Sequence, residues 1–503
     1  MSRGGTRSRG QDWRLVGFYS GRIVVGFGLL MLIPALVAIG EADWSSMLTF
    51  IFSASVTVAS GFAMSISAGQ PQRPAQWYHG LLIASVAWVL ATLFGAIPYD
   101  LSGYYLSYLD AAFDVMSGLT TTGLSLIQHP DAISDAMNTY RFIVTYVGGL
   151  GIVVMALTFF VNEGGAFKLY VGEAKDERIL PNVRSTARAI WRIGLLYLVV
   201  GSALLFVTLV IGGFPIARAP WNAVWMFLSA FSTGGFAPHS QNLLYYHNPI
   251  FEFAVVSIAI IGSLNFAFHY ALWQGRWKEA TRDLEFLTFF LSVNIMWLFV
   301  AIGLIRVGAY SGIAEIIRIG YLNLISAHTT TGVSNIYAPQ FPVRWGSLAM
   351  LGMVMAMLIG GSATSTAGGF KGIRVGILLR AIAEDVRRML LPERAVVRSR
   401  FHHIEDSVLT DARVRGAAVI IMLYLATFAT VALILALYGY PLTSSLFEAA
   451  SVTGNVGLSS GITQASMAPV LKLLFMVAMW VGRLEFMSVF ALVASLIRGR
   501  VPA

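Results

Sequence analysis

Four short strings of polar residues and glycine recur along the chain, and the chemistry that they could supply is the binding of a cation by backbone oxygen atoms. Each string places a hydroxyl-rich or glycine-containing triplet before a glycine and an apolar residue after it. Several neutral carbonyls can together replace part of the water around a potassium ion and still release it. Glycine permits the dihedral angles that turn successive carbonyls inwards. The strings occupy residues 117–124, 229–236, 326–333 and 450–458.

The shared register of the strings favours an ion filter over four surface turns. A single string would suit a surface turn equally well, with glycine ending a helix. Four strings, each after a short apolar segment, are hard to attribute to chance, and a short helix there would direct the partial negative charge of its carboxyl end towards an ion. The candidate ligands of potassium are Thr121, Thr122, Gly123, Thr233, Gly234, Gly235, Thr330, Thr331, Gly332, Asn455, Val456 and Gly457.

A glycine-rich stretch, 360–369, interrupts a later apolar segment. It lacks both the Gly-Lys-Ser/Thr ending of a phosphate-binding loop and a preceding strand, and no Gly-x-Gly-x-x-Gly fingerprint opens a strand–helix unit, so we expect no nucleotide on this chain. Glycine-rich backbone at membrane depth normally lines a water-filled path, and a helix kink or packing surface is the alternative. The candidate gate residues are Gly360, Gly361, Gly368, Gly369, Lys371 and Arg483.

Arg483 and Glu485 lie within the last apolar span, where a charge costs about 2.5–3.5 kcal/mol on insertion scales. We expect Arg483 to face a cavity as a barrier to cations, or else to form a structural salt bridge with another repeat. Four carboxylates beside the short helices could either concentrate cations or hydrogen-bond the loop backbone and cap helices. These are Asp110, Asp114, Glu315 and Glu448. His402 and His403 have no further ligands at metal-binding spacing, so we expect a solvated loop there.

The elements that must position these residues are membrane helices. Of the 503 residues, 57% are apolar and 12% are charged, which is typical of a polytopic membrane protein. Without cysteine there are no disulfides or thiolate metal sites. The net charge of +9 does not indicate nucleic acid binding, because the basic residues lie between apolar spans. Ten spans are long enough to cross a bilayer: 15–39, 46–68, 77–98, 139–162, 190–212, 249–272, 285–307, 345–385 with an interruption, 412–438 and 467–497.

Shorter apolar pieces lie between alternate spans, at 107–119, 220–231, 314–328 and 443–453. Lysine and arginine concentrate in alternate connections, which predicts that both termini are cytoplasmic and that the short pieces lie on the outer side. The first span is too long for the apolar segment of a signal peptide, so we expect it to be retained. The predicted division is a tail and leading helix pair (1–75), followed by pore-loop repeats at 76–165, 166–275, 276–400 with a gate loop at 360–370, and 401–503.

The four loops and the leading pair resemble the Trk/Ktr/HKT superfamily of potassium transporters, specifically its bacterial TrkH/TrkG-type subunits, over nearly the whole chain. The resemblance implies an all-α fold in which four helix–pore-loop–helix repeats surround one pore in pseudo-fourfold arrangement. It also implies that Gly123, Gly235, Gly332 and Gly457 are the key filter glycines and that four glycines favour potassium over sodium. Ser-Thr-Gly-Gly-Phe in the second loop departs from the Asn-Asn-Ala-Gly-Phe common in the family, and only fine selectivity depends on that difference.

By the same resemblance, the glycine-rich loop gates the pathway beneath the filter, Arg483 repels cations there, and the chain forms a homodimer in the lipid of the bacterial inner membrane. A cytoplasmic, nucleotide-binding regulatory subunit of the TrkA type is the implied partner, for which the basic connections 163–192, 273–283 and 371–415 are docking candidates. Potassium uptake is therefore the predicted function. A sodium or sodium/potassium transporter is the alternative, and a membrane enzyme is disfavoured because no carboxylate pair, histidine cluster or nucleophile motif recurs near the cytoplasmic face.

Overall fold

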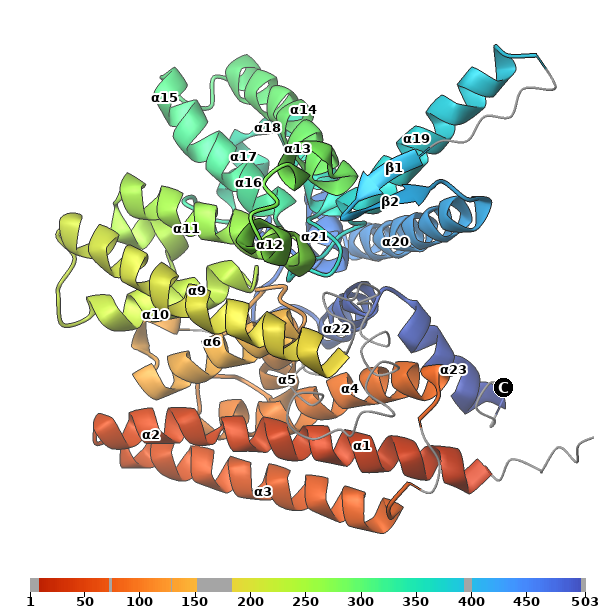
Figure 1. The fold of residues 1–503 in the computed structure, drawn as a ribbon. Coiled ribbons are helices and arrows are strands. Elements are labelled where there is room, and N and C mark those ends of the chain that lie inside the picture. Colours follow the sequence, from red (N-terminus) through yellow and green to blue (C-terminus); the bar gives the residue numbers. More distant parts are fainter. Residues whose placement is uncertain (1–8, 72–74, 128, 152–182, 393–399, 499–503) are drawn as a thin grey trace, which may run out of the picture.

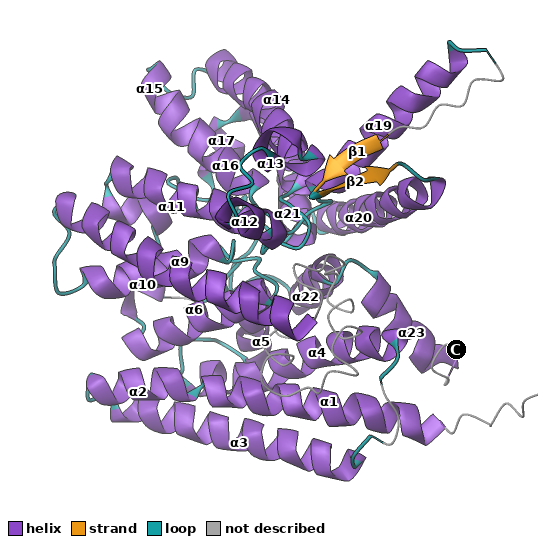
Figure 2. Ribbon diagram, viewed as in Figure 1, coloured by secondary structure: helices purple, strands orange, loops and turns teal. Residues whose placement is uncertain are grey.

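The computed structural model describes residues 9–71, 75–127, 129–151, 183–392 and 400–498. Most of these residues are helical and very few are in strands (Figure 2), which confirms the all-α polytopic fold. Within the described ranges the two strands are β1 (Arg400–His403) and β2 (Glu405–Val408), which pair as an antiparallel hairpin in the connection where we expected a solvated loop.

The leading helices form an antiparallel pair at one edge of the molecule (Figure 1). Helices α1 (Arg9–Leu30) and α2 (Leu32–Gly40) act as one span that packs on α3 (Trp44–Ala68), and α1 also contacts α4 (Trp77–Leu101). The first two spans approach closely where a Cβ on Gly21 would lie 2.6 Å from the Gly61 carbonyl oxygen. Small residues at such a crossing let membrane helices pack backbone to backbone.

The first two repeats share the order of span, short helix, loop and span. Repeat 1 comprises α4, α5 (Tyr108–Leu119), η1 (Pro130–Ala132) and α6 (Asp135–Leu150). Repeat 2 comprises α9 (Val183–Ile211), α10 (Ala219–Phe231), η2 (Asn242–Tyr246), α11 (Pro249–Ser263) and α12 (Phe266–Trp273). At the starts of α5, α6 and α11, polar side chains accept hydrogen bonds from first-turn amides, which fixes where these helices begin. These side chains are Ser107, Ser134 and Asn248.

The last two repeats follow the same order. Repeat 3 comprises α13 (Glu279–Arg282), α14 (Leu284–Val307), α15 (Ile313–Glu315), the π-helical turn η3 (Ile316–Tyr321), α16 (Leu322–His328), α17 (Gln340–Arg344), α18 (Gly346–Ile359) and α19 (Gly372–Met389). Repeat 4 comprises α20 (Asp411–Leu437), α21 (Leu442–Thr453), α22 (Pro469–Arg483) and α23 (Met487–Arg498). All four predicted short pieces are therefore helical.

Two predicted spans are sharply bent, which the hydropathy pattern did not reveal. The span at 249–272 turns by 98° between α11 and α12, where Asn265 caps the new helix by accepting from the Ala267 amide. The span at 467–497 turns by 114° between α22 and α23, where Glu485 and Phe486 have positive φ angles of 51° and 71°. Hydropathy records how apolar a segment is and not where its hydrogen-bond ladder breaks, so the two breaks were missed.

By length and composition, six helices and two bent pairs in the described ranges can cross a membrane. The other two predicted spans are α6, whose predicted continuation to 162 lies outside the described residues beyond 151, and α18 with α19, which are separated by the glycine-rich stretch. Large apolar side chains are exposed on the outward faces of the helices, as with Val199 at 70% and Leu298 at 60%. Such surfaces are typical of lipid contact, so the protein is a multi-pass membrane protein.

The four repeats follow one another around a common centre (Figure 1). Contacts join α6 to α10, α11 to α16, α18 to α21, and α22 back to α5, so the circuit of repeats closes on itself. This closure places the loop after each short helix towards the middle of the molecule.

Candidate functional site

The four polar strings meet in a closed ring at the centre of the circuit. Each key glycine lies against the next, because a Cβ built on it would approach the neighbouring glycine Cα more closely than ordinary van der Waals contact allows. The distance from the added Cβ to the Cα of the next glycine is 2.9 Å for Gly123 and Gly235 and 3.3 Å for Gly235 and Gly332. It is 3.0 Å for Gly332 and Gly457 and 3.2 Å for Gly457 and Gly123, which closes the ring. We call residues 120–123, 232–235, 329–332 and 454–457 the loop ring. It brings together every candidate ion ligand predicted from the sequence.

The backbone of the loop ring repeats the same unusual conformation four times. The residue two positions before each glycine has a left-handed φ: 55° at Thr121, 51° at Thr233, 55° at Thr330 and 55° at Asn455. The glycines themselves have φ angles of 83°, 73°, 80° and 95° in chain order. A left-handed non-glycine residue costs about 1–3 kcal/mol and persists only where its surroundings enforce it, typically at functional sites. Four such residues in register mean that the packing of the ring enforces one backbone conformation four times.

We call the short helix before each loop its pore helix: α5, α10, α16 and α21. Each pore helix passes into the loop ring through the same turn. The amide that precedes the glycine donates to a serine carbonyl in the last turn of the helix, at 2.8–2.9 Å. The donor and acceptor pairs are Thr122 and Ser117, Gly234 and Ser229, Thr331 and Ser326, and Val456 and Ser451. The helices thus end directly at the ring, and the negative ends of their dipoles are directed towards it.

In repeats 1 and 4 a carboxylate on the pore helix holds the chain that leaves the ring. Asp114 accepts from the Leu126 amide at 2.6 Å and from the Ser125 hydroxyl at 2.5 Å. Glu448 accepts from the Ser460 amide at 2.8 Å and the Thr463 amide at 3.2 Å, as well as from neighbouring hydroxyls. Both carboxylates are fully buried. Of the two roles considered for them, attracting cations or hydrogen-bonding the loop backbone, their contacts favour the second.

The other two carboxylates singled out in the sequence have different environments. Asp110 is buried in an ion pair with Lys472, which joins the pore helix of repeat 1 to α22. Glu315 is exposed and accepts from the amide and hydroxyl of Ser311. Asp110 therefore acts between repeats, and Glu315 is a surface residue.

In repeat 3 the support for the loop comes from a neighbouring repeat. Asn323 stands where repeats 1 and 4 carry their carboxylate, and its amide donates to Asn335 at 2.8 Å. Asn335 in turn donates at 3.0 Å to Glu252 on α11 of repeat 2, which also forms a bidentate pair with Arg318 at 2.6 and 3.1 Å. The sequence analysis missed Glu252, although a carboxylate inside an apolar span is itself a signal of function.

The glycine-rich stretch lies against all four loops of the ring. The Thr233 hydroxyl donates to the Thr366 hydroxyl at 3.2 Å, and the Thr121 hydroxyl donates to the Thr366 carbonyl at 3.4 Å. The Gly368 amide donates to the Thr330 hydroxyl at 2.7 Å, and a Cβ on Gly368 would lie 3.1 Å from the Cβ of Asn455. An irregular segment packed across the ring is therefore in position to obstruct a path through it.

Arg483 fastens this segment to the opposite side of the circuit. One of its terminal nitrogens donates to the Thr366 carbonyl at 2.6 Å, and the other donates to the Gly148 and Gly149 carbonyls of α6 at 2.9 and 3.1 Å. Its neighbour Glu485 pairs instead with Arg374 on α19. The guanidinium thus links the glycine-rich stretch to α6 through main-chain carbonyls.

Three further residues fix the ends of the glycine-rich stretch. Gly360 and Gly369 have φ angles of 71° and 77°, and buried Lys371, with φ 76°, donates from its Nζ to the Ala367 carbonyl. Gly361 packs closely, because a Cβ there would lie 3.0 Å from the Ser263 carbonyl oxygen. The predicted gate residues therefore lie in one loop with Arg483 across it.

The loop is also tied to the β hairpin through a carboxylate that the sequence analysis did not single out. Glu285, at the start of α14, accepts from the Ala363 amide at 2.6 Å and from the Ile373 amide at 3.2 Å. The other oxygen of Glu285 lies 4.0 Å from His403 Nε2, and His403 pairs with Asp283 at 2.9 Å. The two hairpin histidines are thus engaged with carboxylates, and the described residues contain no cluster suited to a metal ion.

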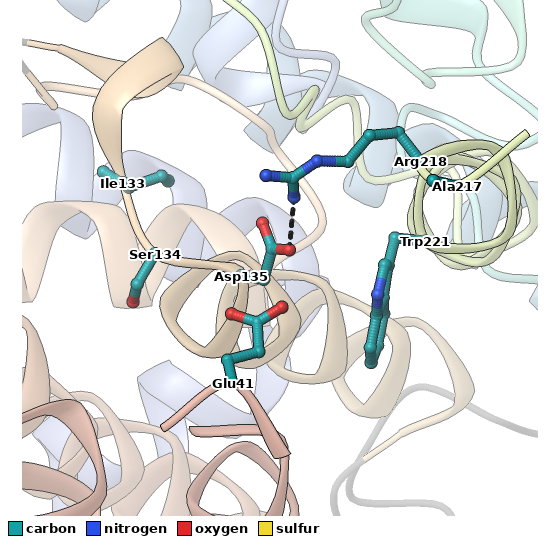
Figure 3. A pocket seen from close by; sticks show the side chains of 7 residues that line it. All are labelled: Glu41, Ile133, Ser134, Asp135, Ala217, Arg218 and Trp221. Atoms are coloured by element: carbon teal, nitrogen blue, oxygen red, sulfur yellow. Dashed lines mark hydrogen bonds and ion pairs between the residues drawn. The ribbon is translucent and has the colours of Figure 1, made fainter. Parts of the chain in front are cut away.

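A separate pocket of about 540 Å³ lies among the ends of α2, α6 and α10 (Figure 3). The Arg218–Asp135 ion pair crosses it at 2.5 Å, and Glu41 lies beside the Asp135 carboxylate. Burial raises the pKa of Glu41 to about 7, and the hydrogen bond and charge of Asp135 act in the same direction. No residue of the loop ring lines this pocket.

Comparisons with known proteins show what the chain as a whole is similar to. The model of the TrkH family, described as cation transport proteins, matches residues 45–498. An uncharacterised cation transporter of Methanocaldococcus jannaschii is 29% identical over 95% of this chain and 94% of its own length. The Trk system potassium uptake protein TrkH of Halomonas elongata is 27% identical over 94% of this chain and 96% of its own.

The crystal structure of the potassium transporter TrkH from Vibrio parahaemolyticus superposes with a TM-score of 0.80, covering 95% of this chain and 98% of that one. At 24% identity this likeness bears on the fold alone. The family match spans nearly the whole chain, and the relatives are named as transporters and not as enzymes. The chain therefore belongs to the TrkH family of cation transport proteins.

Proposed function

We propose that this chain takes up potassium across the bacterial inner membrane and that the loop ring is its selectivity filter. The observation that carries the proposal is the fourfold repetition of one strained backbone around a closed ring of glycines. Such a ring offers several neutral carbonyls to one ion, which is how backbone filters replace the hydration shell. The relative in Halomonas elongata is named a potassium uptake protein, which supports potassium as the ion.

The glycine-rich loop and Arg483 would form the gate beneath this filter. The loop contacts all four strands of the ring, and a positive charge fixed below them raises the electrostatic energy of a cation on the pathway. Opening requires Arg483 to release the Thr366 carbonyl or the α6 carbonyls, so the gate has a defined contact to break.

The remaining parts of the proposal concern the assembly. Both termini would be cytoplasmic, following the distribution of lysine and arginine, and the chain would work as a homodimer with a TrkA-type nucleotide-binding subunit on the cytoplasmic side. The β hairpin and α13 lie in the basic connections proposed for docking, and Glu285 links them to the gate loop.

The decisive experiment is potassium uptake by transport-deficient cells that express this chain, compared with a Gly332→Ser variant. The added Cβ would lie 3.0 Å from the Gly457 Cα in a backbone with φ 80°, so the strands must shift and the preference for potassium over sodium should fall. An unchanged ranking of ions in the variant would argue against the filter. Preferential sodium uptake by the unaltered chain would favour the alternative, a sodium or sodium/potassium transporter.

A further inference from the structure

The second loop of the ring lacks the support that its own pore helix provides in repeats 1 and 4. Met226 stands at the position of Asp114 and Glu448, counted back from the left-handed residue of each loop. A thioether cannot hold backbone amides as a carboxylate does. The second loop nevertheless has the same backbone conformation as the others. Its own pore helix contributes the Ser229 hydroxyl, which donates to the Phe236 carbonyl at 2.6 Å, and further contacts on the loop come from neighbouring repeats.

One group of contacts on repeat 2 comes from the beginning of α6 and the turn before it. Asp131 accepts from the Ser240 amide at 3.1 Å and lies 3.2 Å from His239 Nδ1. Asp135 pairs with Arg218, the residue before α10. One turn further along α6, the Thr139 hydroxyl accepts from the Trp225 indole at 3.2 Å. This segment of repeat 1 thus holds both ends of the second pore loop.

Arg141 follows Thr139 on α6 and contacts the second loop just after Gly235. Its guanidinium carbon lies 4.8 Å from the ring centroid of Phe236, the residue that follows Gly235. One terminal nitrogen donates to the Ala237 carbonyl at 3.4 Å and to the Asn138 side chain at 3.3 Å. The side chain is 2% exposed, and its charge also acts on the carboxylate of Asp114, which supports the first loop.

Burying this guanidinium is costly, so simple filling of space does not account for a charge at this position. Its Nε has no hydrogen-bond partner among the described residues, and an apolar side chain would fill the same space without the loss of hydration. The charge does supply an attraction for the face of Phe236 and for the Ala237 carbonyl. These are the two residues that follow the second filter glycine.

We propose that Arg141 is a positioning residue that sets the ion preference of the second filter strand from the neighbouring repeat. The inference rests on the proposed function, since it requires that the loop ring selects ions. Loss of the guanidinium would remove the contacts on the Phe236 ring and the Ala237 carbonyl and leave the Ser229 hydroxyl to hold the Phe236 carbonyl. The carbonyls of the second strand would then no longer keep the spacing that the other three strands keep.

The test is uptake of potassium in competition with sodium in transport-deficient cells, normalised to the amount of full-length chain in the membrane. Arg141→Gln removes the charge and keeps an amide donor, whereas Arg141→Lys keeps the charge and loses the planar group. The matched control is Arg344→Gln on α17, which removes an equal charge at an exposed site. We expect the preference for potassium over sodium to fall about tenfold in both Arg141 variants, which corresponds to the loss of one hydrogen bond to a charged group. The control should stay within about twofold of the unaltered chain.

A second variant keeps the test decisive if the Arg141 variants fail to accumulate. Phe236→Leu preserves apolar packing but removes the aromatic face, so preference should fall severalfold with Arg141 in place. Wild-type preference in Phe236→Leu, or in either Arg141 variant, would overturn the inference while leaving potassium selectivity of the unaltered chain intact. Absence of any potassium preference in the unaltered chain would overturn the proposed function itself.

Discussion

The pore loops of repeats 1 and 4 differ from those of repeats 2 and 3 in what holds them in place. Asp114 and Glu448 lie on the pore helix of the loop that they support, and each binds backbone amides a few residues beyond the ring. Repeat 3 depends on Glu252 of repeat 2. The second loop has no carboxylate on its own pore helix and combines the Ser229 hydroxyl of that helix with contacts from repeat 1, among them Arg141. Four loops of one backbone conformation are thus supported in two ways.

This difference teaches that the symmetry of the ring belongs to the backbone and not to the side chains around it. A support within a repeat fixes its own loop, whereas a support from a neighbour makes one loop depend on the packing of two repeats. Because each loop also lies against the next, a fault in any support should spread around the ring. The size of the effect should follow the burial and the number of hydrogen bonds lost.

The largest effect is expected at a support within a repeat. Glu448→Ala removes an acceptor that serves two backbone amides and several hydroxyls, all in a fully buried setting. Leaving such groups unsatisfied should cost about 3–5 kcal/mol and abolish uptake. Thermal unfolding of the purified protein and potassium uptake would measure both, with exposed Glu315→Ala as the control. A stable, active Glu448→Ala protein would contradict the assignment of this carboxylate as a support.

A smaller effect is expected at the support that crosses from repeat 2 to repeat 3. Glu252→Gln weakens the pair with Arg318, whose side chain is 39% exposed and can regain water, but it keeps an oxygen for Asn335. We expect a loss of about 1–2 kcal/mol with reduced ion preference. A double-mutant cycle with Arg318→Gln would reveal the coupling. Simple additivity of the two changes would mean that the pair does not support the third loop.

The glycine-rich loop should respond in flux and not in ion preference. Glu285→Gln weakens the acceptor of the Ala363 and Ile373 amides and the link to His403, without touching the ring. The gate should then open more readily, so that potassium flux rises about threefold, equivalent to half a neutral hydrogen bond. Flux assays in proteoliposomes would check this. A change in the potassium to sodium ratio with unaltered flux would assign Glu285 to the filter instead.

The smallest effect is expected in how the melting temperature depends on pH, and it comes from Glu41 in the pocket between α2, α6 and α10. The pKa of Glu41 is raised from the ordinary 4.5 to about 7, so the folded protein favours the protonated carboxyl. This contribution to stability is complete below pH 4.5 and is lost as the pH rises through 7. The melting temperature should fall by about 1 °C over that window, and Glu41→Gln should remove the fall. An identical pH profile in the variant would exclude Glu41 as its origin.

Much of the site was predictable because it depends on short stretches of sequence. The predicted short segments at 107–119 and 443–453 correspond to Tyr108–Leu119 and Leu442–Thr453, and the strings after them form the ring. The two bends, the hairpin and the roles of Glu252 and Glu285 were not predicted. A charged residue within a span marks a site but does not name its partner.

The sequence by itself determined the apolar spans, the pore helices and the glycines that allow a left-handed backbone, because each depends on residues that are neighbours along the chain. Only the tertiary structure decided which groups hold the loops, that Arg483 spans from the glycine-rich loop to α6, and that the ring closes from Gly457 to Gly123. Arg141 and Ala237 are 96 residues apart, and Glu252 and Asn335 are 83 apart. Hydropathy and local conformational preference carry no information on such pairs, since the pairs form only when the repeats pack into a circuit.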